Sequence, residues 1–183
     1  MNLETNRLII RNLRESDLED FFEYRSDPRV CEFQGYEPIT REDAEKFFGE
    51  LKDAQPGKPG ECVRLGIELK SKNKLIGDIA LKSESNEPRI VEGGVSLSNQ
   101  YQGNGYAKEA LTAVFDFLFN EAAIHRITGI VDVENPGVIR LLETLKFRRE
   151  AEFKQSFWDA SKNEWRDEFL YAMLASDWKS NLK

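Results

Sequence analysis

One stretch of the sequence decides how the rest is interpreted: Val91-Glu92-Gly93-Gly94-Val95-Ser96-Leu97-Ser98-Asn99-Gln100-Tyr101-Gln102-Gly103-Asn104-Gly105-Tyr106-Ala107. Its first half predicts a strand, and the residues from Gly105 onward have the apolar spacing of a long helix. Gly103 and Gly105, in the turn between them, lack a Cβ, so a ligand can approach the backbone closely. The first N–H groups of a helix have no partner within it, and the helix dipole favours anions. The turn is therefore a candidate cradle for a pyrophosphate.

Other phosphate motifs fit this turn poorly. No Gly-Lys-Ser or Gly-Lys-Thr follows it, which argues against a Walker A loop and a phosphate-loop nucleotide enzyme. The three glycines of a dinucleotide fingerprint are also missing, and the preceding strand is not the first of the chain. Taken alone, the Gly-x-Gly turn is also explained by an ordinary tight connection between a strand and a helix.

Hydrophobic periodicity predicts seven strands and four main helices along the chain. The strands are expected at 8–13, 63–69, 75–82, 91–98, 127–133, about 149–158 and about 166–174. The helices are expected to begin at the caps Ser16, Thr40 and Asn135 and at the 103–105 turn. The order β-α-α-β-β-β-α-β-α-β-β indicates one mixed α/β domain over residues 1–183. The Pro- and Gly-rich segment 54–60 predicts a surface loop rather than a domain boundary.

The composition narrows the class of protein. The chain has 183 residues and a formal net charge of −7, which argues against a duplex-DNA-binding protein and is compatible with a cationic partner, which an acidic protein would attract. A single histidine, His125, and two cysteines without a CxxC pair argue against a metal site and fit a reduced cytoplasmic setting. No apolar run approaches the ~18–20 residues that cross a membrane. The start of the chain does not resemble a signal peptide.

Several motifs, in the right order, resemble those of the GNAT acetyltransferases. Gln102-Gly103-Asn104-Gly105-Tyr106-Ala107 matches the Gln/Arg-x-x-Gly-x-Gly/Ala motif at the place where that family has it. The segments 125–127, 132–136 and 145–147 are similar to the family's fifth strand and the following helix. The segments 4–11, 26–30, 164–167 and 171–174 look like the branch that contains the ribosomal-protein-alanine N-acetyltransferases. The resemblance covers nearly the whole chain.

The resemblance implies the GNAT fold, a mixed sheet of about seven strands with four main helices. Acetyl-CoA would lie where the fourth and fifth strands splay apart, and no metal is implied. The pantetheine arm would pair with the strand backbone around Ser96 and Leu97, and Asn135 would contact the cofactor, cap the next helix, or do both. The pyrophosphate would be held by a run of N–H groups, with Gln102 bracing the turn. That run comprises Gly103, Asn104, Gly105, Tyr106 and Ala107.

The same resemblance implies that a neutral primary amine attacks the thioester directly, without a covalent enzyme intermediate. Glu92 is the candidate general base, and a solvated or salt-bridged glutamate is the alternative. Glu32 and Tyr36 are candidates for the acceptor site. Gly93-Gly94 predicts a β-bulge whose N–H groups would polarise the thioester carbonyl, and a close approach between the strand and a helix is the alternative.

Two residues depart from the family's pattern. Val138 stands where many relatives have a serine, and no tyrosine lies between positions 136 and 145, so the sequence offers no acid for the leaving thiolate. Lys146 replaces the glycine that is usual before Phe147, at a position where a helix C-terminus favours glycine.

We therefore expect an acetyl-CoA-dependent N-acetyltransferase. The expected acceptor is a primary amine, on a protein N-terminus such as that of a ribosomal protein or on a small cationic molecule. The alternative is a GNAT-fold module that binds acyl-CoA without turnover. The twelve phenylalanines are expected mainly in the core, and a homodimer contact is the alternative for some of them.

Overall fold

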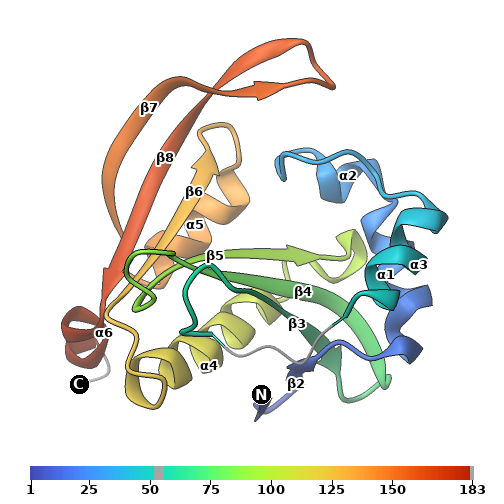
Figure 1. Cartoon of the computed structure of the whole chain (residues 1–183), viewed down its shortest axis with the longest axis horizontal. Coiled ribbons are helices and arrows are strands. Elements are labelled where there is room, and N and C mark those ends of the chain that lie inside the picture. Colours follow the sequence, from blue (N-terminus) through green and yellow to red (C-terminus); the bar gives the residue numbers. More distant parts are fainter. Residues whose placement is uncertain (52–55, 182–183) are drawn as a thin grey trace.

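The computed structural model describes residues 1–51 and 56–181, which form an eight-stranded sheet with helices packed on it (Figure 1). The strand order is β1-β2-β3-β4-β5-β6-β8-β7, and all neighbours are antiparallel except β5 and β6, which run parallel. The strands are β1 (Asn2–Glu4), β2 (Leu8–Asn12), β3 (Cys62–Leu69), β4 (Lys74–Ser83), β5 (Ile90–Leu97), β6 (Arg126–Asp132), β7 (Arg148–Asp159) and β8 (Glu164–Leu174). The expected mixed α/β fold is confirmed, with β1 as an additional strand.

The helices include the four that the sequence predicts and two short ones that it does not. They are α1 (Leu18–Arg25), α2 (Pro28–Cys31), α3 (Arg41–Gly49), α4 (Tyr106–Asn120), α5 (Pro136–Thr144) and α6 (Ala175–Asn181), with 3₁₀ turns at Glu15–Asp17 and Asn99–Tyr101. Of the loop predicted at 54–60, residues 54 and 55 lie outside the described residues, and the rest forms turns.

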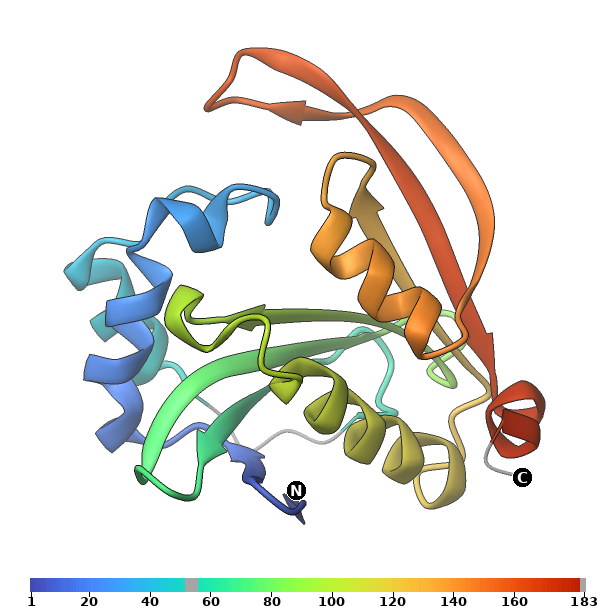
Figure 2. The same cartoon turned by 180° about the vertical axis from the view of Figure 1, so that it is seen from behind.

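Helices α1 and α4 cover opposite faces of the sheet (Figure 2). Adjacent residues of β4 show this, because side chains alternate between faces along a strand. Asp78 bonds to Tyr24 and Arg25 of α1, whereas Ile79 joins the main core. That core includes the buried stripe of α4, as the periodicity predicts: Ala110, Leu111, Val114 and Leu118, together with Phe115 and Phe119. A smaller cluster of Leu13, Phe21, Tyr24, Val30, Phe48 and Leu75 packs α1 and α3 onto the sheet.

The helix caps are partly as predicted. Thr40 accepts a hydrogen bond from the N–H of Asp43, which confirms it as the cap of α3. The prediction that Ser16 caps the first helix is wrong. The 3₁₀ turn Glu15–Asp17 comes first, and the Asp17 carboxylate accepts a hydrogen bond from the N–H of Arg14. Asp17 also pairs with the buried Arg11, so a tertiary ion pair fixes this helix entry.

The predicted β-bulge at Gly93-Gly94 is wrong. Residues 91–97 of β5 pair one to one with β4 without a register shift. Instead, β5 separates from β6 on its other side, because the β5–β6 ladder ends at the pair Glu92 and Thr128. The sheet therefore divides between β5 and β6, because β5 stays regularly paired with β4 and β6 stays regularly paired with β8.

Lys146 takes the backbone conformation that a glycine would take. Its φ is +64°, in the left-handed region. The N–H of Phe147 donates to the carbonyl of Leu142, and the N–H of Lys146 donates to that of Glu143. These two hydrogen bonds form a Schellman motif that ends α5, so the lysine leaves the cap intact at the cost of an unfavourable φ.

Candidate active site

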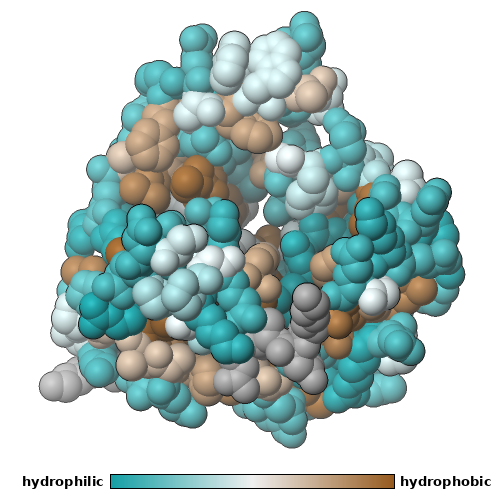
Figure 3. Space-filling model, viewed as in Figure 1, coloured by the Kyte–Doolittle hydropathy of each residue, from teal (hydrophilic) through white to brown (hydrophobic). Residues whose placement is uncertain are grey.

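The splay between β5 and β6 opens a cleft of about 610 Å³, including its part open to solvent. Gly93, Gly94 and Val95 line one wall, residues 127–132 of β6 line the other, and Leu111 and Phe115 of α4 lie at its base. The space-filling view shows an opening between these segments, with apolar side chains on its walls (Figure 3). The strands predicted to splay therefore enclose a cleft.

Main-chain groups of β5 that have no strand partner face this cleft. The N–H of Ser98, directly after β5, donates to the carbonyl of Ile76 in β4, and the carbonyl of Ile90 accepts from the N–H of Glu84, which directly follows β4. Because hydrogen bonding alternates along a regular antiparallel pair, Ser96 also bonds toward β4, whereas Val95 and Leu97 face the splay. The pairing of a pantetheine arm around Ser96 and Leu97 stays a prediction; in this register the main-chain groups of Leu97 and Val95, and not those of Ser96, face the splay.

In the turn before α4, the main-chain N–H groups are free to bind a ligand, and side chains hold main-chain carbonyls by hydrogen bonds. Gly103 and Gly105 have φ values of +76° and +79°, in the left-handed region where glycine is favoured. Within the described part of the chain, none of the N–H groups of residues 103–107 donates a hydrogen bond. The amide of Asn104 donates to the carbonyls of Tyr101 and Gln102, at 3.3 and 2.9 Å.

Gln102 connects this turn to the cleft. Its amide Nε2 donates to the carbonyl of Leu97 at 3.0 Å, so the end of β5 and the start of α4 are held together. In a trans peptide unit the C=O and the following N–H point in opposite directions. A carbonyl that a side chain holds by a hydrogen bond therefore directs the N–H of the next residue to the opposite side of the turn, where that N–H is free.

The segment after α2 reaches the cleft through a residue that the sequence analysis did not single out. The Gln34 amide donates to the carbonyl of Val95 at 3.4 Å and accepts from the Ser96 hydroxyl at 3.3 Å. Phe33 and Gln34 line the cleft. Nothing in the local sequence marks Gln34, because its partners lie about sixty positions away.

Tyr36 and Ser96, both predicted site residues, are in contact. Their hydroxyl oxygens lie 3.2 Å apart. Burial raises the pKa of Tyr36 above its ordinary value, and this outweighs the lowering by the Arg25 cation and the Ser96 hydrogen bond. The Arg25 guanidinium lies 4.5 Å from the centre of the Tyr36 ring.

A buried cluster of charged side chains lies next to the contact between Tyr36 and Ser96. Arg25 pairs with Asp78 at 2.8 Å, and both side chains are almost fully buried. Burial disfavours the charged Asp78, but the cations Arg25 and Arg64 and the hydroxyl of Tyr24 hold its pKa below the ordinary value. The charged pair fixes α1 against β4, directly opposite Ser96 on β5.

The two predicted acidic site residues lie outside the cleft lining. Glu92 is exposed at the last β5–β6 pair, so it stands where the two strands begin to separate, on the same face of β5 as Ser96. Glu32 is exposed at the end of α2. Both roles stay predictions.

Asn135 lines the cleft and also caps α5. Its Oδ1 accepts a hydrogen bond from the N–H of Val138 at 3.1 Å. Val138 lines the cleft as well, without an acidic hydrogen to donate. The capping role predicted for Asn135 is confirmed, and contact with a cofactor stays a prediction.

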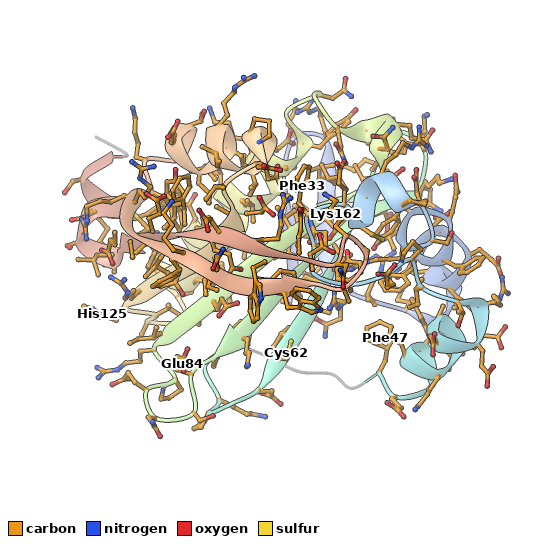
Figure 4. The ribbon with its side chains drawn as sticks, turned by 90° about the horizontal axis from the view of Figure 1, so that it is seen from above. Phe33, Phe47, Cys62, Glu84, His125 and Lys162 are labelled. Carbon is orange, nitrogen blue, oxygen red and sulfur yellow. The ribbon has the colours of Figure 1, made fainter. Side chains whose placement is uncertain are left out.

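The β7–β8 hairpin crosses over the cleft and meets the segment after α2. Lys162, in the hairpin turn, lies 5.5 Å from the centre of the Phe33 ring, and Figure 4 shows the two side chains side by side. A Cβ at Gly35 would lie 3.1 Å from the ring of Phe157, so that ring packs directly on the glycine. The hairpin and the segment after α2 thus border the side of the cleft away from α4 (Figures 1 and 2).

Two absences hold across residues 1–51 and 56–181. No helix there is long and apolar enough to cross a bilayer. No group of three or more His, Cys, Asp or Glu side chains there is arranged to hold a metal ion.

Comparison with known proteins identifies the family. Residues 7–148 match the family described as "Acetyltransferase (GNAT) domain". The uncharacterized N-acetyltransferase YnaD of Bacillus subtilis is 32% identical over 97% of this chain and 99% of its own length. The [ribosomal protein uS5]-alanine N-acetyltransferase of Escherichia coli is 25% identical over 97% and 93% of the two chains. This lower identity gives only weak support to the ribosomal-protein branch.

A solved structure shares the fold. The spermidine N-acetyltransferase of Vibrio cholerae, solved with CoA and spermine, superimposes with a TM-score of 0.81 at 21% identity and covers 96% and 99% of the two chains. The family match spans more than half of the chain, and the YnaD relative covers nearly all of it. The chain therefore belongs to the GNAT family of acetyl-CoA-dependent N-acetyltransferases.

Proposed function

We propose that the protein transfers the acetyl group of acetyl-CoA to the primary amine of a peptide N-terminus or of a small cationic molecule. The observation that carries the proposal is the run of five N–H groups, residues 103–107 at the start of α4, that have no hydrogen-bond partner among the residues the structure describes. Donors that point outward from a helix N-terminus favour an anion, and the diphosphate of CoA is the anion that the family's substrate supplies.

The rest of the site fits the neutral part of the same substrate. The amide groups of a pantetheine arm require main-chain partners, and Val95 and Leu97 direct theirs to the open side of β5, where Gln102 already holds the carbonyl of Leu97. The largely apolar cleft walls suit the arm's methylene groups. Gln34 holds the carbonyl of Val95 in this structure, so a bound arm would compete with it for that group.

In the proposed reaction, the neutral amine nitrogen forms a bond to the thioester carbon, the C–S bond breaks, and CoA leaves as a thiolate. Glu92, at the point where β5 and β6 begin to separate, would take the proton from nitrogen directly or through a water molecule. A thiol has a pKa of ~8.5, so the thiolate can leave as such or take a proton from water without an acid at position 138.

Two observations bear on the acceptor. The net charge of −7 would attract a cationic amine. The uS5-alanine acetyltransferase relative, whose printed name gives an N-terminal alanine acceptor, supports a peptide N-terminus. The homodimer contact predicted from the composition stays a prediction.

The test is release of free thiol from acetyl-CoA in the presence of a panel of amines. The panel holds ribosomal-protein N-terminal peptides, polyamines and amino-acid analogues, each with its N-acetylated form as a matched control. We expect release with one class of free amine and none with the acetylated controls. Binding of acetyl-CoA with no release by any amine would contradict the proposed transfer, and absence of binding would contradict the placement of the diphosphate.

A further inference from the structure

The N-terminal segment is tied to the turn that precedes α4 through one carboxylate. Glu109, in the first turn of α4, accepts three hydrogen bonds from this segment. Its Oε1 accepts from the Thr5 hydroxyl at 2.6 Å and from the N–H of Arg7 at 2.8 Å, and its Oε2 accepts from Arg7 Nε at 2.6 Å. Burial disfavours the charged form, but these hydrogen bonds lower the pKa of Glu109, so the carboxylate is charged when it holds Arg7.

Arg7, fixed in this way, contacts three consecutive residues of the turn. Its Nη1 donates to the carbonyl of Asn104 at 3.0 Å. The Nη2 atom of Arg7 lies 3.5 Å from the position that a Cβ at Gly105 would take, and the Cζ atom of Arg7 lies 4.3 Å from the centre of the Tyr106 ring.

The hydrogen bond to Asn104 has a geometric consequence. The carbonyl of Asn104 and the N–H of Gly105 belong to one planar trans peptide unit and point in opposite directions. Holding that carbonyl toward Arg7 therefore keeps the N–H of Gly105 pointing away from Arg7, on the free side of the turn. The Tyr106 ring, which lies against the guanidinium, gives Arg7 a second contact with the turn.

We propose that Arg7 is a positioning residue for cofactor binding: it holds the 104–106 turn in the conformation that binds the diphosphate of CoA. The inference rests on the proposed placement of that diphosphate. Arg7 acts through Asn104 and Tyr106, and Glu109 with Thr5 acts through Arg7. This gives the N-terminal segment, which lies outside the cleft, a role in cofactor affinity.

Lysine cannot replace Arg7 in this arrangement. The guanidinium uses Nε toward Glu109 and Nη1 toward Asn104 at the same time, whereas an ammonium is a single point of charge without a planar fork. Arg41 provides a matched control elsewhere on the surface. It pairs with Glu19 and Glu45 and lies 5.5 Å from the centre of the Phe22 ring, so it has the same kinds of contact without touching the turn.

The experiment compares the dissociation constants of CoA, of dephospho-CoA and of pantetheine, which lacks the diphosphate, for the wild type and for Arg7→Ala, Arg7→Lys and Arg41→Ala. For both Arg7 variants we expect CoA and dephospho-CoA to bind roughly tenfold more weakly or worse, and pantetheine to bind as it does to the wild type. Arg41→Ala should bind all three ligands as the wild type does.

Three results would overturn the proposal for Arg7: unchanged CoA affinity in Arg7→Ala, an equal loss for CoA and pantetheine, or full rescue by lysine. A loss for CoA but not for dephospho-CoA would assign Arg7 to the 3′-phosphate and would also overturn it. If Arg7→Ala fails to fold, Glu109→Gln keeps the test open, because it removes the charge that fixes Arg7 and should also weaken CoA binding but not pantetheine binding. Equal affinity of the wild type for CoA and pantetheine would instead contradict the diphosphate site itself.

Discussion

Replacing Gly105 by glutamate or by glutamine separates charge from shape at the proposed diphosphate site. Gly105 has φ +79°, so any side chain there costs about 1–2 kcal/mol of stability. A Cβ would make only an ordinary contact, 3.5 Å from Arg7 Nη2, so both variants should fold. Gly105→Glu and Gly105→Gln share this strain and nearly the same volume, and they differ by one negative charge.

The size of the charge effect follows from Coulomb's law. A carboxylate at this position would lie within about 5 Å of a phosphate held by the neighbouring N–H groups, which gives ~1–3 kcal/mol for an effective dielectric constant between that of water and about 20. The dissociation constant of CoA should therefore be roughly 5- to 100-fold higher for Gly105→Glu than for Gly105→Gln.

Isothermal titration calorimetry with CoA at low and at high salt measures this difference. Gly105 is exposed, so added salt should screen the charge and narrow the gap between the two variants. Pantetheine should show no gap at either salt concentration. Equal CoA affinities for Gly105→Glu and Gly105→Gln at low salt would refute the assignment of the diphosphate to this turn.

Four further predictions concern single residues. Glu92→Gln should lower turnover without changing CoA affinity, and most strongly at low pH, where an acceptor amine of pKa ~7.7–10.4 is largely protonated; a pH profile like that of the wild type would remove Glu92 as the base. Asp78→Asn leaves Arg25 buried without its carboxylate and should cost about 3–5 kcal/mol in denaturant unfolding, and a loss under 1 kcal/mol would contradict the buried pair. Lys146→Gly should relieve the left-handed φ and raise the melting temperature by about 2–4 °C for ~1 kcal/mol, whereas a lower melting temperature would show that the lysine side chain contributes more. Because the folded-state pKa of Glu109 is lowered, the stability that its carboxylate contributes is complete above the unfolded pKa of ~4.3 and is lost as pH falls through the folded value. The difference in unfolding free energy between wild type and Glu109→Gln should therefore shrink below about pH 4. A difference that stays constant with pH would argue against this role of the Glu109 charge.

The local features of the site could be predicted from the sequence. The strand-turn-helix stretch that ends at Ala107, the two glycines and the cap at Asn135 depend on residues close together in the chain, and the structure shows each of these elements. Gly93-Gly94 was misleading, since both a bulge and an open cleft wall are compatible with two glycines. Only the unbroken pairing with β4 distinguishes between them.

The contacts that complete the site join distant segments. Arg7 meets Asn104 across 97 positions, and Gln34 meets Val95 across 61, so no local pattern marks either residue. The side of β5 that faces the cleft depends on its register with β4, which fixes Val95 rather than Ser96 as the open position. Contacts between distant segments and the register between strands thus decide which residues complete the site, and the periodicity within one strand reveals neither.

The central claim is that main-chain N–H groups at the start of α4 hold the diphosphate of CoA. Titration of ¹⁵N-labelled protein with CoA and, separately, with pantetheine tests it most directly, because the amide resonances of Gly103 and Gly105 report on those groups themselves. We predict large shifts of both resonances with CoA and small ones with pantetheine. CoA binding that leaves both glycine resonances in place would contradict the claim.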